Sequence, residues 1–221
     1  MNEIMRRRRA LIAASGEAIP AGYVKDGLIL FLDGKQAGAS SWTDLVGGKT
    51  ITLTDCTYNG NGVIFNGTSS KGSYSGALSS DWNTETIEAA FSTTMADSRD
   101  ILNQPAPGII LRLSLSAGDM RIITVGSRQT FRKFQATTNA KLISATKDKA
   151  FYNKVKCSST ATVTPSAPVS TLIGAREVTA GTITQYFPGT IYAIRIYNRQ
   201  LTDAEILQNQ QADMDRYGIT I

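Results

Sequence analysis

Two glutamates, Glu85 and Glu88, come nearest to a catalytic pair in this sequence. Retaining glycosidases place two carboxyl groups about 5–5.5 Å apart, one as the nucleophile and one as the acid. Residues three positions apart in a β-strand point to opposite faces, so these two carboxylates should not act together. We therefore expect no catalytic residues here and disfavour a glycoside hydrolase.

The remaining reactive side chains exclude several other kinds of chemistry. The sequence has no histidine, which removes Ser-His-Asp triads, Cys-His pairs and histidine zinc sites. Cys56 and Cys157 are too few for a zinc site, and we expect two free thiols rather than a disulfide. The fragment Gly48-Lys49-Thr50 lacks the rest of a phosphate-binding loop.

Glycan binding is the main functional hypothesis from the residues. Proteins bind sugars through aromatic rings and planar polar groups, placed in loops or on a sheet surface. Several such residues lie in or beside segments rich in Gly, Ser and Asn, with Asn103, Arg128 and Arg132 as further polar contacts. The candidate glycan-binding residues are Trp42, Tyr58, Tyr74, Trp82, Arg99 and Tyr186. The alternative for each aromatic residue is a place in the core.

Calcium is the one cofactor that the sequence leaves open. Asp33, Asp44 and Asp81 could supply oxygen ligands, although the chain has no spaced Asp-x-Asp cluster. Aspartates in such segments are more often turn or cap residues, so a metal-free protein is the first expectation.

Positive charge is concentrated near the N-terminus. The net charge is +5, and Arg6, Arg7, Arg8 and Arg9 supply four of these charges, which leaves +1 for the rest (5 − 4). A globally basic nucleic-acid-binding surface is therefore not expected, whereas a local basic arm is. We interpret residues 1–26 as this arm, which either binds a partner subunit, contacts nucleic acid or remains a disordered tail.

The same segment does not resemble a classical signal peptide. The apolar run that follows the arginines spans five residues, 10–14, and an h-region needs about seven. No stretch approaches the ~18 apolar residues of a membrane span, so we expect no membrane partner.

Residues 27–221 read as one all-β domain. Short apolar or alternating runs separated by Gly, Asn and Ser turns predict strands throughout this range. The expected strands cover 28–32, 49–54, 62–65, 86–92, 109–115, 120–125, 141–146, 150–157, 169–174 and 190–198. The last is apolar on both faces and should be a central strand.

One helix is expected at the C-terminus. Thr202 and Glu205 form a capping box, Leu201 and Ile206 a hydrophobic staple, and Gly218 suits the helix end. Leu207, Met214 and Tyr217 recur at helical spacing. Many strands and one late helix predict a sandwich of two antiparallel sheets.

The segment 187–206, which contains Ile194, Tyr197, Asn198 and Leu201, resembles the closing segment of laminin-G-like, concanavalin A-like domains. The segments 27–33, 63–67, 86–91 and 151–154 resemble other parts of these domains in the expected order. The resemblance implies a concanavalin A-like jelly roll. It does not imply one function, because this fold serves lectins, adhesion modules, glycosidases and phage proteins.

The opening from Met5 to Ala14 also resembles the start of tail and surface proteins of bacteriophages. This resemblance implies a virion surface protein that stays in the host cytoplasm until release. The expected function is glycan or host-surface recognition within a virion, with other virion proteins as partners and a homo-oligomer as the assembly. The alternative is a purely structural virion protein anchored by its arm.

Overall fold

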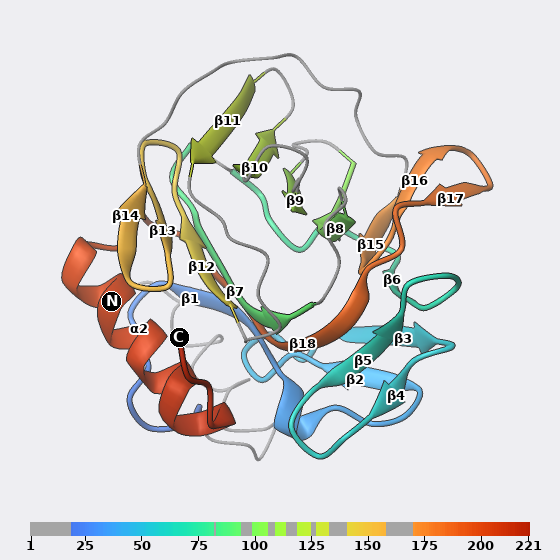
Figure 1. Ribbon diagram of the computed structural model, residues 1–221, viewed down its shortest axis with the longest axis horizontal. Helices are drawn as coiled ribbons and strands as arrows, with labels where there is room; N and C mark the ends of the chain where they lie inside the picture. The colour runs from blue at the N-terminus through green and yellow to red at the C-terminus, as the bar shows by residue number, and fades with distance from the viewer. Residues whose placement is uncertain are drawn as a thin grey trace, which may run out of the picture.

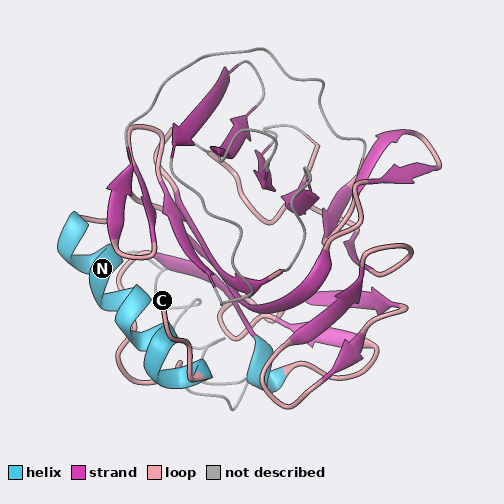
Figure 2. Ribbon diagram, in the orientation of Figure 1, coloured by secondary structure: helices cyan, strands magenta, loops and turns pink. Residues whose placement is uncertain are grey.

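The computed structural model describes residues 19–81, 83–93, 99–105, 109–113, 119–124, 127–132, 141–157 and 170–221, with backbone only between 109 and 132. Nearly all its elements are β-strands, arranged in two large antiparallel sheets (Figures 1 and 2). A short 3-10 helix, η1 (Gly34–Gln36), and the C-terminal helix α2 (Asp203–Tyr217) complete the described elements. The predicted all-β sandwich with one late α-helix is confirmed.

Sheet A is built around the long central strand β18. From edge to edge its strands are β14 (Val155–Cys157), β13 (Ala150–Tyr152), β12 (Lys141–Ala145), β7 (Thr86–Ser92), β18 (Pro188–Tyr197), β5 (Val63–Asn66) and β4 (Thr57–Tyr58). Strand β1 (Leu28–Asp33) pairs with the second half of β18, where β5 no longer does. The central position predicted for residues 190–198 is therefore confirmed.

Sheet B forms the second layer. Its strands are, in order, β11 (Ser127–Arg132), β10 (Asp119–Thr124), β9 (Ile109–Leu113), β8 (Arg99–Asn103), β15 (Thr171–Ile173), β6 (Lys71–Tyr74), β3 (Thr50–Thr54) and β2 (Ser41–Thr43). A separate hairpin of β16 (Arg176–Thr179) and β17 (Thr182–Thr184) leads from sheet B back to β18.

The main core lies between the two sheets. Strand β3 shows the pattern that produces it, because Ile51 and Leu53 are buried while Thr50, Thr52 and Thr54 are exposed. Sheet A contributes apolar side chains from β1, β7, β12 and β18 to the same cluster. This burial of alternate residues from both sheets is the main stabilising contribution of the sandwich.

A second core lies on the outer face of sheet A, beneath α2. Ala193 and Tyr197 of β18 face this side, and Ile206 and Tyr217 of the helix pack over them. Thr202 and Glu205 form the predicted capping box, and Gly218 ends the helix with a left-handed φ of 65°. Leu207 differs from its predicted apolar role, since its side chain is 37% exposed.

The folded structure begins earlier than the sequence predicted. Tyr23 and Val24 are 4% and 8% exposed and belong to the core beneath α2, although we expected residues 1–26 to form an arm. The last residues of the predicted arm are therefore part of the sandwich domain. The arginines at 6, 7, 8 and 9 lie outside the described residues, so their role stays a prediction.

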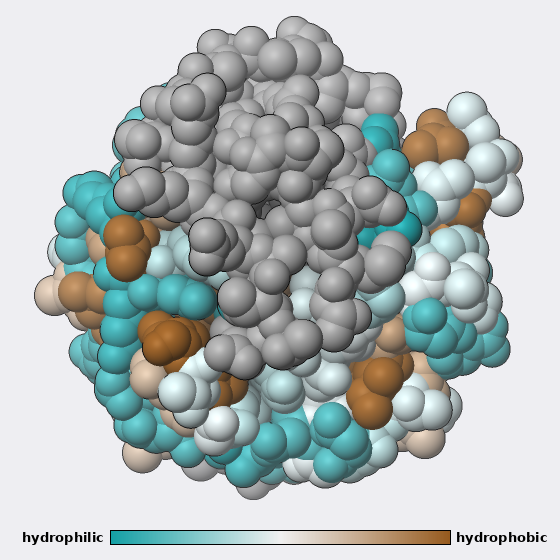
Figure 3. All heavy atoms as spheres, viewed as in Figure 1, coloured by the Kyte–Doolittle hydropathy of each residue, from teal (hydrophilic) through white to brown (hydrophobic). Residues whose placement is uncertain are grey.

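In the described part of the chain, no helix has the length and apolar character needed to span a membrane. On the face seen in Figure 3, hydrophobic residues outside the grey region lie in small separate groups among hydrophilic ones. Among the side chains that the structure describes, the large apolar ones that are exposed are Tyr58, Val155, Leu207 and Ile221.

Candidate functional site

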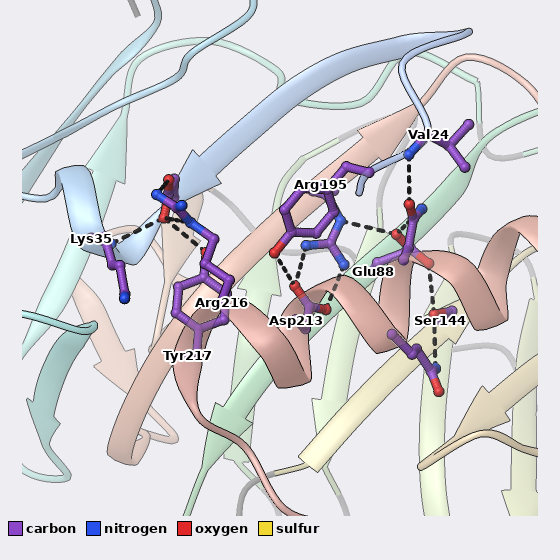
Figure 4. A network of polar contacts seen from close by, with 12 residues as sticks. Val24, Lys35, Glu88, Ser144, Arg195, Asp213, Arg216 and Tyr217 are labelled. Carbon is purple, nitrogen blue, oxygen red and sulfur yellow. Dashed lines mark hydrogen bonds and ion pairs between the residues drawn. The ribbon is translucent and has the colours of Figure 1, made fainter. Parts of the chain in front are cut away.

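The most prominent polar cluster is a buried charge network between sheet A and α2. Arg195 of β18 lies between Glu88 of β7 and Asp213 of α2 (Figure 4), and all three side chains are 1% exposed. The Arg195 Nε donates to Glu88 Oε2 at 3.0 Å. Its Nη1 and Nη2 donate to the two oxygens of Asp213 at 2.6 Å each. The guanidinium therefore holds two carboxylates from different elements.

The remaining groups of this network also have partners. Asn209 donates from Nδ2 to Glu88 and to the Tyr197 hydroxyl, and its oxygen accepts from Val24 N at 2.8 Å. Ser144 donates to the other Glu88 oxygen at 2.8 Å. Polar groups that already have hydrogen-bond partners within the protein are typical of a structural network rather than of a site that receives a substrate.

Burial and the neighbouring charges act on the two central groups in different ways. Burial raises the pKa of Glu88, and the positive charge of Arg195 opposes this shift. Burial disfavours the charged form of Arg195, but the carboxylates of Asp213 and Glu88 raise its pKa above the ordinary value. Arg195 therefore stays charged and serves to fasten α2 to the sheet.

The two glutamates considered as a catalytic pair are engaged separately. Glu85 accepts hydrogen bonds from Ser79, Ser80 and the Asp81 N–H in the preceding loop. Glu88 belongs to the network beneath α2. The two carboxylates therefore contact different partners, and their exclusion as a catalytic pair stays a prediction.

The candidate calcium ligands have structural partners instead. Asp33 accepts from Arg216 and Tyr217 at the end of α2, and Asp44 accepts from the backbone N–H groups of Phe31, Val46 and Gly47. Asp81 accepts from Asn83 in an exposed turn. Among the described residues, no three acidic or cysteine side chains lie together as a metal site.

The cysteines show no reactive environment. Both are free thiols, as the sequence predicted, and both are half-buried. Burial raises the pKa of Cys56 to about 11, which keeps its thiol protonated and poorly nucleophilic at neutral pH.

The predicted aromatic contacts separate into different environments. Trp42 is 0% exposed and donates its indole N–H to the Asp33 carbonyl at 2.9 Å, so it is a core residue and not a glycan contact as proposed from sequence. Tyr74 packs partly against the main core. Tyr58, on the edge strand β4, is 38% exposed, and its hydroxyl donates to the Lys35 carbonyl. Trp82 lies outside the described residues.

Arg99 and Tyr186, in contrast, are brought to the same corner of the molecule. Arg99 begins β8, and the N–H of the next residue, Asp100, donates to the Gln185 carbonyl at 3.4 Å. Tyr186 follows Gln185 in the connection from β17 to β18 and is partly exposed. The structure thus joins two predicted contacts through residues 99–100 and 185–186.

Further polar side chains surround this corner. Asn103 of β8 is 0% exposed, and its Nδ2 donates to the Ala175 carbonyl at 2.6 Å. Arg176 of β16 is 8% exposed and pairs through its backbone with Thr184, next to Gln185. We refer to Arg99, Asn103, Arg176, Gln185 and Tyr186 as the corner cluster. Sequence reasoning missed Arg176 and Gln185. They come close together only because the β16–β17 hairpin pairs Arg176 with Thr184, and no local motif marks this hairpin.

No protein-family model and no curated protein matches the sequence. Solved structures do match the fold. The Trypanosoma rangeli sialidase in complex with sialic acid has a TM-score of 0.63 and 14% identity, over 94% of this chain and 38% of that one. A mutant of HCR/D has a TM-score of 0.60 and 14% identity, over 89% of this chain and 55% of that one.

A third match is to a single domain. Domain 4 of AbnA, a GH43 extracellular arabinanase from Geobacillus stearothermophilus, was solved in complex with arabinotriose. The TM-score is 0.58 and the identity 16%, over 83% of this chain and 98% of that domain.

At these identities the matches establish the fold alone. The chain spans less than two fifths of the sialidase chain and about half of HCR/D, whereas it spans almost all of the arabinanase domain. The protein is therefore a jelly-roll β-sandwich domain, and its membership of the laminin-G-like family stays a prediction.

Proposed function

We propose that this chain is a glycan-binding module that does not cleave its ligand. The observation that carries the proposal is the fold match to the arabinotriose-bound domain, which extends over nearly the whole of that domain. A fold of this kind places loops and a sheet surface where a sugar can bind, although the fold by itself does not choose the ligand.

The arrangement of described side chains supports binding without catalysis. Glu85 and Glu88 are both engaged by structural partners, and α2 covers part of the outer face of sheet A. The corner cluster lies elsewhere, beside β8 and β15 of sheet B, and contains planar polar groups and a partly exposed tyrosine. These are the side-chain types that orient sugars.

A glycan array with the full chain, followed by calorimetric titration of the best ligands, tests this proposal. We expect saturable binding to at least one oligosaccharide class, with arabinotriose included as a defined neutral probe. Chromatography after prolonged incubation should recover the oligosaccharide intact. Release of shorter sugars would identify a glycosidase, and the absence of binding to every glycan tested would refute the proposed function.

From the sequence we also propose that the module is part of a phage virion, as a tail, fibre or decoration protein at the virion surface. The run Arg6 to Arg9 favours an attachment arm, which a free glycan-binding module would not need. A purely structural virion protein with the same arm is the second candidate.

Size-exclusion chromatography with light scattering distinguishes these roles from a free module. The full chain should form a defined oligomer, and a variant with all four arginines at 6–9 replaced by Gln should be monomeric. Monomers in both samples would contradict an assembly arm. An oligomer that binds no glycan would favour the purely structural role.

A further inference from the structure

Two buried amide oxygens in the corner cluster have no hydrogen-bond partner. They are Asn103 Oδ1 and Gln185 Oε1. The neighbouring Gln104 shows the usual pattern, because its oxygen accepts from Leu78 N and Ser79 N while its Nε2 donates to the Ser79 carbonyl. A buried acceptor without a donor is unfavourable, so each such group in a folded protein calls for a missing partner.

Backbone contacts place both residues at one corner. The Nδ2 of Asn103 reaches the carbonyl of Ala175, which lies one residue before β16. Gly174 N donates to Ile101 of β8, and Phe187 N donates to the Gly174 carbonyl at 2.8 Å. Segments 99–103, 174–176 and 185–187 therefore meet, although the first is more than seventy positions from the other two.

The corner also reaches the surface. Asn103 is fully buried, but Gln185 and Tyr186 are partly exposed. Gln185 holds a φ of 57°, a left-handed conformation that a residue with a side chain rarely adopts. This backbone places the glutamine amide at the corner, with its oxygen buried and part of the residue open to solvent.

We propose that Asn103 Oδ1 and Gln185 Oε1 form a subsite that accepts hydrogen bonds from the hydroxyl groups of a neutral sugar, beside Tyr186. This inference rests on the proposed glycan binding and specifies where and what kind of sugar binds. Two amide oxygens favour a ligand that donates hydrogen bonds, and they disfavour a carboxylate, which only accepts. Arg99 and Arg176, which belong to the same cluster, each have an interaction partner of their own.

The variant Gln185→Met tests the subsite, because it keeps the length of the side chain and removes the acceptor. Gln36→Met is the matched control, since Gln36 is an exposed glutamine of η1. Gln185→Asn is a second variant. Asparagine tolerates a left-handed backbone, but its side chain is one methylene shorter, so its amide oxygen no longer reaches the same position. Removal of an unpartnered buried acceptor should not lower the melting temperature, and this separates a ligand role from a structural one.

Calorimetric titration would use the full chain with arabinotriose as the neutral probe and 3′-sialyllactose as the acidic one. We expect the affinity for the neutral probe to fall about tenfold in both Gln185 variants, with Gln36→Met like wild type. Equal affinity in all four proteins, or binding of the acidic probe only, would overturn the subsite and leave glycan binding intact. Failure of the wild type to bind any glycan would overturn both.

Discussion

Arg195 is the residue on which the attachment of α2 most depends. Its guanidinium holds Glu88 from the sheet and Asp213 from the helix, and all three side chains are almost inaccessible to solvent. A buried ion pair adds little net stability relative to an apolar replacement of the whole group. Removing one member is different, because the remaining charges stay buried without compensation.

We therefore expect Arg195→Met to lower the free energy of unfolding by about 3–5 kcal/mol. Urea denaturation followed by circular dichroism measures this change. Lys156→Met is the control, because Lys156 pairs with Asp203 at an exposed position, where solvent screens the pair and its loss should change stability far less. Similar losses in the two variants would show that the buried network does not fasten the helix.

At the scale of single residues, the sequence predicted only those properties that follow from the spacing of neighbouring residues. The separation of Glu85 and Glu88 argued against a shared reaction centre, and in the structure the two carboxylates contact different partners. The assignment of Trp42 to a binding surface was wrong, because its polar neighbours in sequence do not reveal that the ring turns inward next to Ile51. Nothing local indicates that Gln185 has a left-handed backbone.

At the scale of elements, the N-terminal turn of α2 is a self-contained unit. Thr202 accepts from the Glu205 N–H, and Glu205 accepts from the Thr202 N–H at 2.8 Å. Arg199 donates to both Glu205 oxygens, one of them at 2.9 Å. The hydrogen bond from Arg199 is the largest of the effects that lower the pKa of Glu205 to about 2.

This shift gives the cap a defined pH dependence. The pKa of Glu205 is lower in the folded protein than the ordinary 4.5, so its contribution is fully present above about pH 4.5 and is lost as the pH falls towards 2. Glu205→Gln should be less stable by about 1 kcal/mol at pH 7, a value reduced for solvent screening. The difference in melting temperature between the two proteins should shrink between pH 4.5 and 2. A constant difference would argue against the cap.

Helices and strands that short-range patterns define were predictable from the sequence. The strands with which each strand pairs in its sheet were not. The alternation in β3 and the capping box of α2 are visible in the sequence. The pairing of β15 between β8 and β6 joins segments far apart in the chain, and no short-range signal specifies it. The corner cluster depends on this pairing, so only Arg99, Asn103 and Tyr186 could be proposed beforehand.

At the scale of the whole molecule, the first described residues close the core beneath α2. The Tyr23 ring packs edge-on against Phe31 with centroids 4.9 Å apart, and its hydroxyl donates to Asp213 at 2.9 Å. Val24 N donates to Asn209. The sequence placed this segment outside the domain because Gly and Pro residues surround it and no strand pattern marks it.

Two truncations test this corrected boundary. Removal of residues 1–18 should leave the melting temperature close to that of the full chain. Removal of residues 1–26 deletes Tyr23 and Val24 and should lower the unfolding free energy by several kcal/mol, on the order of 3–5 for the tyrosine alone. Thermal denaturation of the full chain and the two truncated forms measures these differences. Equal stability of the two truncated forms would restore the boundary at Gly27.

The location of this segment determines how the domain would respond to mechanical load. Residues 23 and 24 and the end of α2 meet on one face, because Tyr23, Val24, Tyr217 and Ile219 share the same core. Tension applied between the two ends of the described chain would first act on the Tyr23–Asp213 and Val24–Asn209 contacts, and so peel that face. Both contacts end on α2 rather than on sheet B, so we expect a domain pulled by its ends to open first beneath the helix, before the corner cluster is disturbed.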